Sequence, residues 1–258
     1  MLRLVTLTSA LALSAAAAMA EDIKVGVSPG EHAEIMEEVA KVAQPMGLNI
    51  EVVEFSDYVI PNTALADGDI QANSFQHRPY LENQIKDRGF DLVEIGTTIT
   101  TPMGIYSDKL ESLDALPEGA KIGLPNDPTN GGRALLILQD LGLLTLAEGT
   151  GLVPTPLNIT ENPKDLQFLE LDAAQLPRSL ADTDASVINT NYALAAGLNP
   201  NSDTIAMEKA DSPYVNIIVV RKGDEGQPWA KKLVEAYHSA EVKAFIDEKY
   251  EGSVLTSW

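Results

Sequence analysis

The segment NDPTNGGR, at residues 126–133, carries the clearest chemistry in this chain. It follows an apolar run, and Asn126 or Asp127 can cap a helix that begins at Pro128. The positive end of such a helix attracts an anion. Arg133 lies about one turn further on, where its planar guanidinium can hold a carboxylate through two parallel hydrogen bonds. A plain capped helix with a solvated arginine explains the same residues equally well, so both interpretations stay open at this point.

Aromatic side chains gather near a second expected strand end. The segment FQHRPY, at residues 75–80, runs from a strand into a helix, and Phe75, His77 and Tyr80 can wall an apolar slot. Tyr58 is a possible fourth wall. A thioether makes favourable contacts with aromatic edges. Core packing beside a capped helix is the simpler explanation from physics alone. Aromatic residues make up only 5% of the chain, however, so two such groups near strand ends favour a pocket.

Asparagines follow or begin two further strand-like runs. Asn189 and Asn191 lie in SVINTNY, residues 186–192, and Asn216 closes SPYVN, residues 212–216. The carbonyl oxygen of an asparagine side chain accepts a hydrogen bond from an ammonium group, and its amide donates to a carboxylate. Ordinary turn chemistry explains a single asparagine just as well. Asparagines beside two strands are therefore consistent with a polar binding site and equally with ordinary turns.

Motifs of the common enzyme and metal sites are missing from the sequence. It contains no G-x-S-x-G, no P-loop and no H-E-x-x-H, and its three histidines are scattered. Without cysteine there is neither a thiolate nucleophile nor a thiolate metal site. We therefore expect no catalytic residues, no cofactor and no metal. An enzyme on the same fold and a surface interaction protein remain the alternatives from other classes.

Strand-like and helical segments alternate along the chain, which is typical of an α/β fold. The expected strands are residues 23–27, 49–55, 71–75, 92–99, 120–124, 168–171, 185–190 and 216–221. The expected helices are residues 32–44, 58–66, 78–88, 128–141, 173–181, 228–238 and 240–249, with a surface loop at 148–164. The first strands should form a parallel sheet whose carboxyl ends carry the ligand contacts.

The N-terminus and the net charge indicate an exported, acidic protein. Residues 1–20 carry one base, Arg3, then an uncharged apolar run that ends in Ala-Met-Ala, as in a cleaved signal peptide. Its removal leaves 17 basic against 38 acidic residues, a net charge of −21. Such a chain repels nucleic acid and anionic lipid surfaces. With no cysteine to lipidate, we expect a soluble periplasmic protein.

Several longer strings occur together in a fixed order. They are FQHRPY at 75–80, PNDPTNGGRAL at 125–135, AQLPRSL at 174–180, VINTNYA at 187–193 and SPYVNIIVVR at 212–221. Together they closely resemble the methionine-binding proteins of ABC importers, the NlpA/MetQ family. The resemblance extends over essentially the whole chain after the expected signal peptide.

The resemblance implies a two-lobed periplasmic-binding-protein fold of the type II kind, with the ligand in the cleft between the lobes. One lobe would comprise residues 21–103 and 217–258, and the other residues 104–216. The chain would cross between them near 104–107 and return near 216–220. Most family members look like lipoproteins anchored through an N-terminal cysteine, whereas this chain has none and should diffuse freely.

The resemblance also implies roles for individual residues. Arg133 would clamp the α-carboxylate, Asn191 and Asn216 would hold the head group, and Asn189 would bind ligand or only support Asn191. The ligand side chain would be enclosed by four residues: Tyr58, Phe75, His77 and Tyr80. Protonation of His77 could then tune binding near neutral pH.

The implied ligand is methionine, captured for a membrane permease and a cytoplasmic ATPase. Another small amino acid or a methionine-containing dipeptide is the alternative ligand. We expect the protein itself to be a monomer that performs no catalysis.

Overall fold

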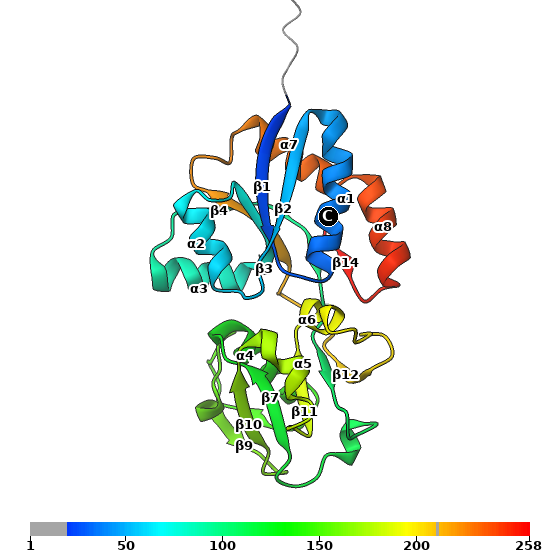
Figure 1. Ribbon diagram of the computed structural model, residues 1–258. Coiled ribbons are helices and arrows are strands. Elements are labelled where there is room, and N and C mark those ends of the chain that lie inside the picture. Colours follow the sequence, from blue (N-terminus) through cyan, green and yellow to red (C-terminus); the bar gives the residue numbers. More distant parts are fainter. Residues whose placement is uncertain (1–19, 210–211) are drawn as a thin grey trace, which may run out of the picture.

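The computed structural model describes residues 20–209 and 212–258. Nearly all of the expected signal peptide, residues 1–19, lies outside the described residues. The described chain forms two lobes, each built on a five-stranded mixed sheet with helices packed against it (Figure 1). The expected two-lobed α/β fold is therefore confirmed.

The elements have the following bounds. The helices are α1 (Glu31–Ala43), α2 (Ile60–Asp67), α3 (Arg78–Arg88), α4 (Pro128–Asp140), α5 (Leu176–Ser179), α6 (Thr190–Ala195), α7 (Pro228–Tyr237) and α8 (Ala240–Tyr250). The strands of the first lobe are β1 (Glu21–Val27), β2 (Leu48–Glu54), β3 (Ala72–His77), β4 (Leu92–Thr97), β5 (Ile99–Thr100), β13 (Asn216–Arg221) and β14 (Leu255–Thr256). Those of the second are β6 (Gly104–Tyr106), β7 (Lys121–Pro125), β8 (Thr145–Leu146), β9 (Ile159–Glu161), β10 (Gln167–Leu171), β11 (Ala185–Ile188) and β12 (Thr204–Met207).

The sheet of the first lobe has the strand order β2-β1-β3-β13-β4. Strand β1 is parallel to β2 and β3, whereas β13 is antiparallel to both of its neighbours. Ile218 and Val220 of β13 pack with α1, α7 and α8, while Ile217 and Val219 pack on the opposite face with α2 and α3. Burial on both faces explains why this strand is a continuous apolar run rather than an alternating one.

The sheet of the second lobe has the order β10-β7-β11-β6-β12. Strands β10, β7 and β11 run parallel, and β6 is antiparallel to β11 and β12. Helix α4 packs into one core cluster with β7 and β11. Residues of α5 and α6 form a separate cluster with Tyr106 and Ile188. Parallel strands β7 and β11 therefore both end beside the helices that carry the polar segments 126–133 and 189–192.

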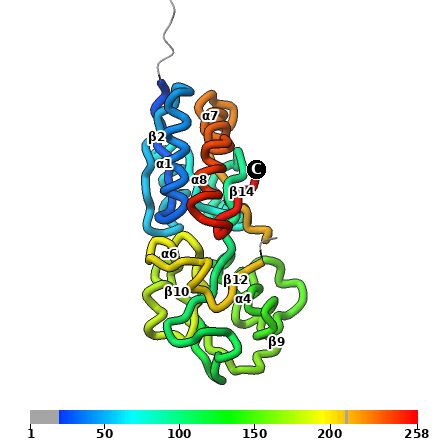
Figure 2. The backbone as a smooth tube through the Cα atoms, turned by 90° about the vertical axis from the view of Figure 1, so that its right-hand side faces the viewer, coloured from blue at the N-terminus to red at the C-terminus, as the bar shows by residue number. Residues whose placement is uncertain are grey.

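Two segments of chain connect the lobes, one between β5 and β6 and the other between β12 and β13 (Figure 2). They are in contact at Met103 and Glu208, where the backbone N–H of Glu208 donates to the carbonyl of Met103 at 2.9 Å. They lie close to α4 and α6, since Arg133 of α4 binds Glu208 and the Thr190 hydroxyl of α6 donates to the Pro102 carbonyl.

The structure differs from the expected elements in a few places. The expected strand 185–190 ends at Ile188, because the N–H groups of Tyr192 and Ala193 bond back to the Asn189 carbonyl and open α6. The expected strand 92–99 is divided at Thr98, whose N–H donates to the Asn216 carbonyl. The expected loop 148–164 includes β9, which pairs with β8. The expected helix 173–181 divides into a 3₁₀ turn and α5.

Within residues 20–209 and 212–258, no helix combines the length and the apolar character needed to cross a membrane.

Candidate ligand-binding site

All eight residues singled out from the sequence line one cavity between the lobes, with a volume of about 330 Å³. The eight are Tyr58, Phe75, His77, Tyr80, Arg133, Asn189, Asn191 and Asn216. Four further residues share the lining: His32, Gln76, Thr101 and Asn130. The cavity therefore draws on both lobes, with β3, α3 and β13 on one side and α4 and α6 on the other.

The first lobe contributes a wall of aromatic rings. The ring of Tyr58 lies 6.0 Å from that of Phe75 and 6.2 Å from that of Tyr80, measured between centroids. Phe75 and Tyr80 are themselves 6.0 Å apart in an edge-to-face arrangement. Such tilted pairs are favoured by the ring quadrupole, and the Tyr80 hydroxyl fixes the group by donating to the Tyr58 carbonyl at 2.8 Å. These rings suit an apolar ligand side chain.

His77 ends this wall at the point where β3 becomes α3. Its Nδ1 accepts a hydrogen bond from the Tyr80 N–H at 3.1 Å, so the proton of the neutral ring is on Nε2, 3.2 Å from the Asn130 side-chain oxygen. Burial, reinforced by the charge of Arg133, lowers the pKa of His77 to about 3. The ring is therefore neutral at physiological pH while the lobes are together, and the tuning of binding by its protonation stays a prediction.

The start of α4 forms the opposite, polar wall. Asp127 is the N-cap, and its Oδ1 accepts from the N–H groups of Thr129 and Asn130 at 3.2 and 2.9 Å. The side chain of Asn130 is fixed in turn, since its Nδ2 donates to Asp127 at 2.9 Å and its oxygen accepts from Asn189 Nδ2 at 2.9 Å. The sequence thus predicted the cap correctly, but Asn130 was not singled out as a member of the site.

The paired glycines of this segment are required by packing. A Cβ on Gly131 would lie 2.7 Å from the Pro125 carbonyl oxygen, and one on Gly132 would lie 2.7 Å from that of Leu152. Both obstacles are backbone atoms, which cannot swing aside. The glycines therefore let α4 approach the end of β7 and the segment that covers it.

Two asparagines leave one buried acceptor and one buried donor at the cavity. Asn191 accepts from the Tyr58 hydroxyl at 2.5 Å across the lobes, which leaves its Nδ2 without a partner among the described residues. Asn189 donates to Asn130, and its Oδ1 has no partner among them. Buried polar atoms rarely go unpaired. An ammonium group on Asn189 and a carboxylate on Asn191 would satisfy both atoms.

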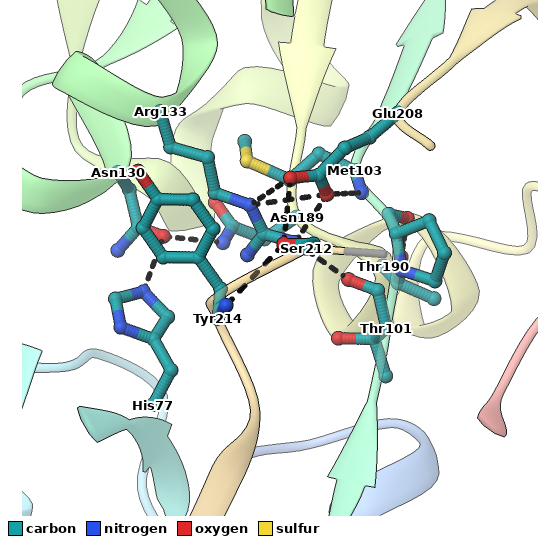
Figure 3. A network of polar contacts seen from close by, with 11 residues as sticks. His77, Thr101, Met103, Asn130, Arg133, Asn189, Thr190, Glu208, Ser212 and Tyr214 are labelled. Atoms are coloured by element: carbon teal, nitrogen blue, oxygen red, sulfur yellow. Dashed lines mark hydrogen bonds and ion pairs between the residues drawn. The ribbon is translucent and has the colours of Figure 1, made fainter. Parts of the chain in front are cut away.

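Arg133 extends from α4 into the same cavity and is only 2% exposed. Its Nε lies 3.0 Å from Glu208 Oε1, and its Nη2 pairs with Glu208 Oε2 and donates to the Thr101 carbonyl at 2.9 Å (Figure 3). The Tyr214 ring lies 4.5 Å from the guanidinium carbon. The edge of the guanidinium formed by Nε and Nη2, which can make two parallel hydrogen bonds, thus binds Glu208 rather than a ligand. Nη1, which has no hydrogen bond among the described residues, is the nitrogen left for the cavity.

The sequence analysis missed several residues that complete the site. His32 lines the cavity from the first turn of α1, after the Pro29–Gly30 turn that ends β1, so the strand-end rule could have identified it. Burial lowers its pKa to about 4, which makes it neutral as well. Glu208 gives no such signal, because it is 75 residues from its partner Arg133. No cluster of three or more candidate metal ligands occurs in the described residues.

Comparisons with known proteins agree with this geometry. The profile of the NlpA lipoprotein family matches residues 23–258. The chain is 50% identical over 239 residues to the D-methionine-binding lipoprotein MetQ of Salmonella typhimurium, covering 92% of this chain and 88% of that protein. The MetQ protein of Escherichia coli K12 is 49% identical with the same coverage.

Solved structures give the same result. A nutrient binding protein from Burkholderia cenocepacia, bound to methionine, has a TM-score of 0.90 and 55% identity, covering 92% of this chain and 100% of that one. The crystal structure of the methionine binding protein MetQ has a TM-score of 0.90 and 49% identity, with 92% and 98% coverage. The resemblance found in the sequence is thus confirmed, and the chain belongs to the NlpA lipoprotein family.

Proposed function

We propose that this protein is a periplasmic solute-binding protein that captures methionine for an ABC importer. One observation carries the proposal: a wall of aromatic rings faces a wall of amides and a guanidinium across one small cavity. An amino acid with an apolar side chain presents these two chemistries at its two ends. The methionine-binding names of the relatives support the choice of side chain.

In the proposed complex, the α-carboxylate lies at Arg133 Nη1 and Asn191 Nδ2. The ammonium lies at Asn189 Oδ1, with Asn216 beside the head group. The thioether lies among three rings and the His77 imidazole, where sulfur makes favourable contacts with aromatic edges. The three rings are those of Tyr58, Phe75 and Tyr80.

Closure of the lobes traps the ligand in this scheme. Contacts already join the lobes: Tyr58 to Asn191 at 2.5 Å and His77 to Asn130 at 3.2 Å at the cavity, and the Tyr192 hydroxyl to the Ser56 carbonyl at 3.2 Å outside it. These bonds exist only while the lobes are together, so ligand that links both walls shifts the population towards closure. The lobes would comprise residues 21–103 with 217–258, and residues 104–216.

The proposed partners are a membrane permease and a cytoplasmic ATPase, reached by a monomer that moves freely in the periplasm. We propose that residues 1–20 are removed on export, so that the mature chain begins at Glu21. N-terminal sequencing of the periplasmic protein tests this cleavage, and light scattering tests the monomer.

Calorimetric titration tests the function itself. The protein is unfolded, dialysed and refolded to remove carried ligand, then titrated with L-methionine, D-methionine and other small amino acids. One-to-one binding in which a methionine enantiomer is the strongest ligand is expected. Absence of heat with both enantiomers would refute the proposed ligand, and mass spectrometry of the material released on unfolding would then identify the true one. Turnover of a bound amine or acid would instead indicate an enzyme.

A further inference from the structure

Glu208 lies outside the cavity lining and binds Arg133 directly. It follows β12, on the segment that returns to the first lobe, and its side chain is 9% exposed. Its carboxylate accepts from Arg133 Nε and Nη2, from the Met103 N–H at 3.0 Å and from the Ser212 hydroxyl at 2.9 Å (Figure 3). The donors at Met103 and Ser212 come from the two segments that connect the lobes. These four donors fix the position of the Glu208 carboxylate.

The cavity is otherwise short of charge. Among the described residues that line it, Arg133 is the one that bears a permanent charge, since burial keeps His32 and His77 neutral. The charges of the Arg133 and Glu208 side chains sum to zero. A site with no net charge suits a ligand that also has none, because neither end of the ligand is left uncompensated.

We propose that Glu208 is the residue that makes this site select a zwitterion. It fixes Arg133 so that Nη1 alone faces the carboxylate, and it cancels the charge of Arg133 so that a neighbouring ammonium group is tolerated. Without Glu208, the unopposed guanidinium would still attract a carboxylate but would repel the ammonium. This inference rests on the proposed function, because it requires that the cavity hold an amino-acid head group.

Two ligands of similar shape separate the effect of Glu208 on the carboxylate from its effect on the ammonium group. One is L-methionine, and the other is des-amino methionine, which keeps the carboxylate and the thioether chain but lacks the ammonium group. Both are titrated by calorimetry into the full chain and into the variant Glu208→Gln, which preserves the size of the side chain and removes its charge.

The matched control is Glu94→Gln. Glu94 holds Arg78 through two bonds of 2.7 Å each, the same forked arrangement, yet neither residue lines the cavity. The control therefore removes the same charge from an Arg–Glu pair without changing the environment of the ligand.

The preference for methionine over des-amino methionine should shrink by about tenfold in Glu208→Gln, because the unopposed charge of Arg133 then repels the ammonium. It should be unchanged in Glu94→Gln. Equal weakening of both ligands in Glu208→Gln, or an unchanged ratio, would overturn the inference and leave the proposed function intact. If the parent protein bound neither ligand, the proposed function would fail and this inference with it.

Circular dichroism establishes that each variant is folded. If Glu208→Gln does not fold, the same ratio is measured in Glu208→Ala, which also removes the charge. The same decrease in the ratio is then expected. A ratio equal to that of the parent would overturn the inference.

Discussion

The two lobes bring opposite chemistries to the same cavity. The first lobe supplies rings, with Tyr58, Phe75 and Tyr80 in contact around β3 and α3. The second supplies the amides of Asn130 and Asn189, linked through a network that begins at the cap of α4. One wall can hold an apolar group and the other a charged head group, so a ligand must span both to draw the lobes together.

The walls also differ in how their geometry is fixed. The aromatic wall is fixed mainly by packing, which tolerates small shifts at modest cost. The polar wall is fixed by directed hydrogen bonds, which leave Asn189 Oδ1 and Asn191 Nδ2 for the ligand. Changes in the polar wall should therefore cost more binding free energy than changes of similar size in the aromatic wall.

The largest effect is expected from Arg133→Ala. Removal of the guanidinium deprives the ligand carboxylate of its cation and leaves Glu208 buried without a counter-charge, so methionine binding should weaken by about 3 to 5 kcal/mol. Titration calorimetry measures the loss. Arg78→Ala is the control, because it truncates an arginine that is half exposed and lies outside the cavity. Parent-like binding by Arg133→Ala would show that the polar wall has been misassigned.

Phe75→Ala should have an intermediate effect. The ring is 4% exposed and packs against Tyr58 and Tyr80, so its loss removes apolar contact with the ligand side chain. We expect methionine binding to weaken by about 1.5 to 3 kcal/mol. Alanine binding, measured in parallel, should change much less, because that ligand does not reach the aromatic wall. Equal losses for the two amino acids would contradict the division of the walls.

Tyr58→Phe tests the hydrogen bond that joins the walls. It removes the hydroxyl that donates to Asn191 and leaves the ring, so binding should weaken by about 1 kcal/mol. Tyr106→Phe is the control, since that hydroxyl has no partner among the described residues. Indistinguishable affinities for the two variants would mean that the Tyr58 contact does not contribute to closure.

The smallest effect is expected from pH. While the lobes are together, burial lowers the pKa of His77 to about 3 and that of His32 to about 4. His77 loses its contact with Asn130 when the lobes open, so its pKa should then return towards the ordinary value of about 6.5. A group whose pKa is lower in the closed form weakens closure as the pH falls through its pKa in the open form. The affinity for methionine should therefore be constant above about pH 7.5 and fall by about fourfold between pH 7.5 and 6. A constant affinity down to pH 5 would show that His77 stays buried when the lobes open.

The sequence predicted the parts of the site that depend on local signals. The cap at Asp127, the strand-to-helix turn at His77 and the aromatic residues around it follow from residue types and short spacings. The alternation of strands and helices likewise predicted most elements to within a few residues. The lobe boundaries were implied by the family resemblance rather than by these signals, and they remain a proposal.

The remaining features depend on contacts between distant parts of the chain. The sequence predicts Asn191 at the end of a strand, whereas it lies in helix α6. The helix could not be recognised from the sequence, because it is only six residues long and shows no apolar periodicity. The pairing of Arg133 with Glu208 links α4 to the returning segment and leaves no mark in either local sequence. The consequence, that Arg133 offers the ligand one nitrogen rather than two, could only be found in three dimensions.

A crystal structure with L-selenomethionine as the ligand tests the division of the walls most directly, because anomalous scattering locates the selenium atom independently of the remaining density. We predict selenium among Tyr58, Phe75 and Tyr80, with the carboxylate at Arg133 Nη1. Selenium beside Arg133 and Asn189, or outside the cavity altogether, would contradict the proposed orientation and the roles assigned to both lobes.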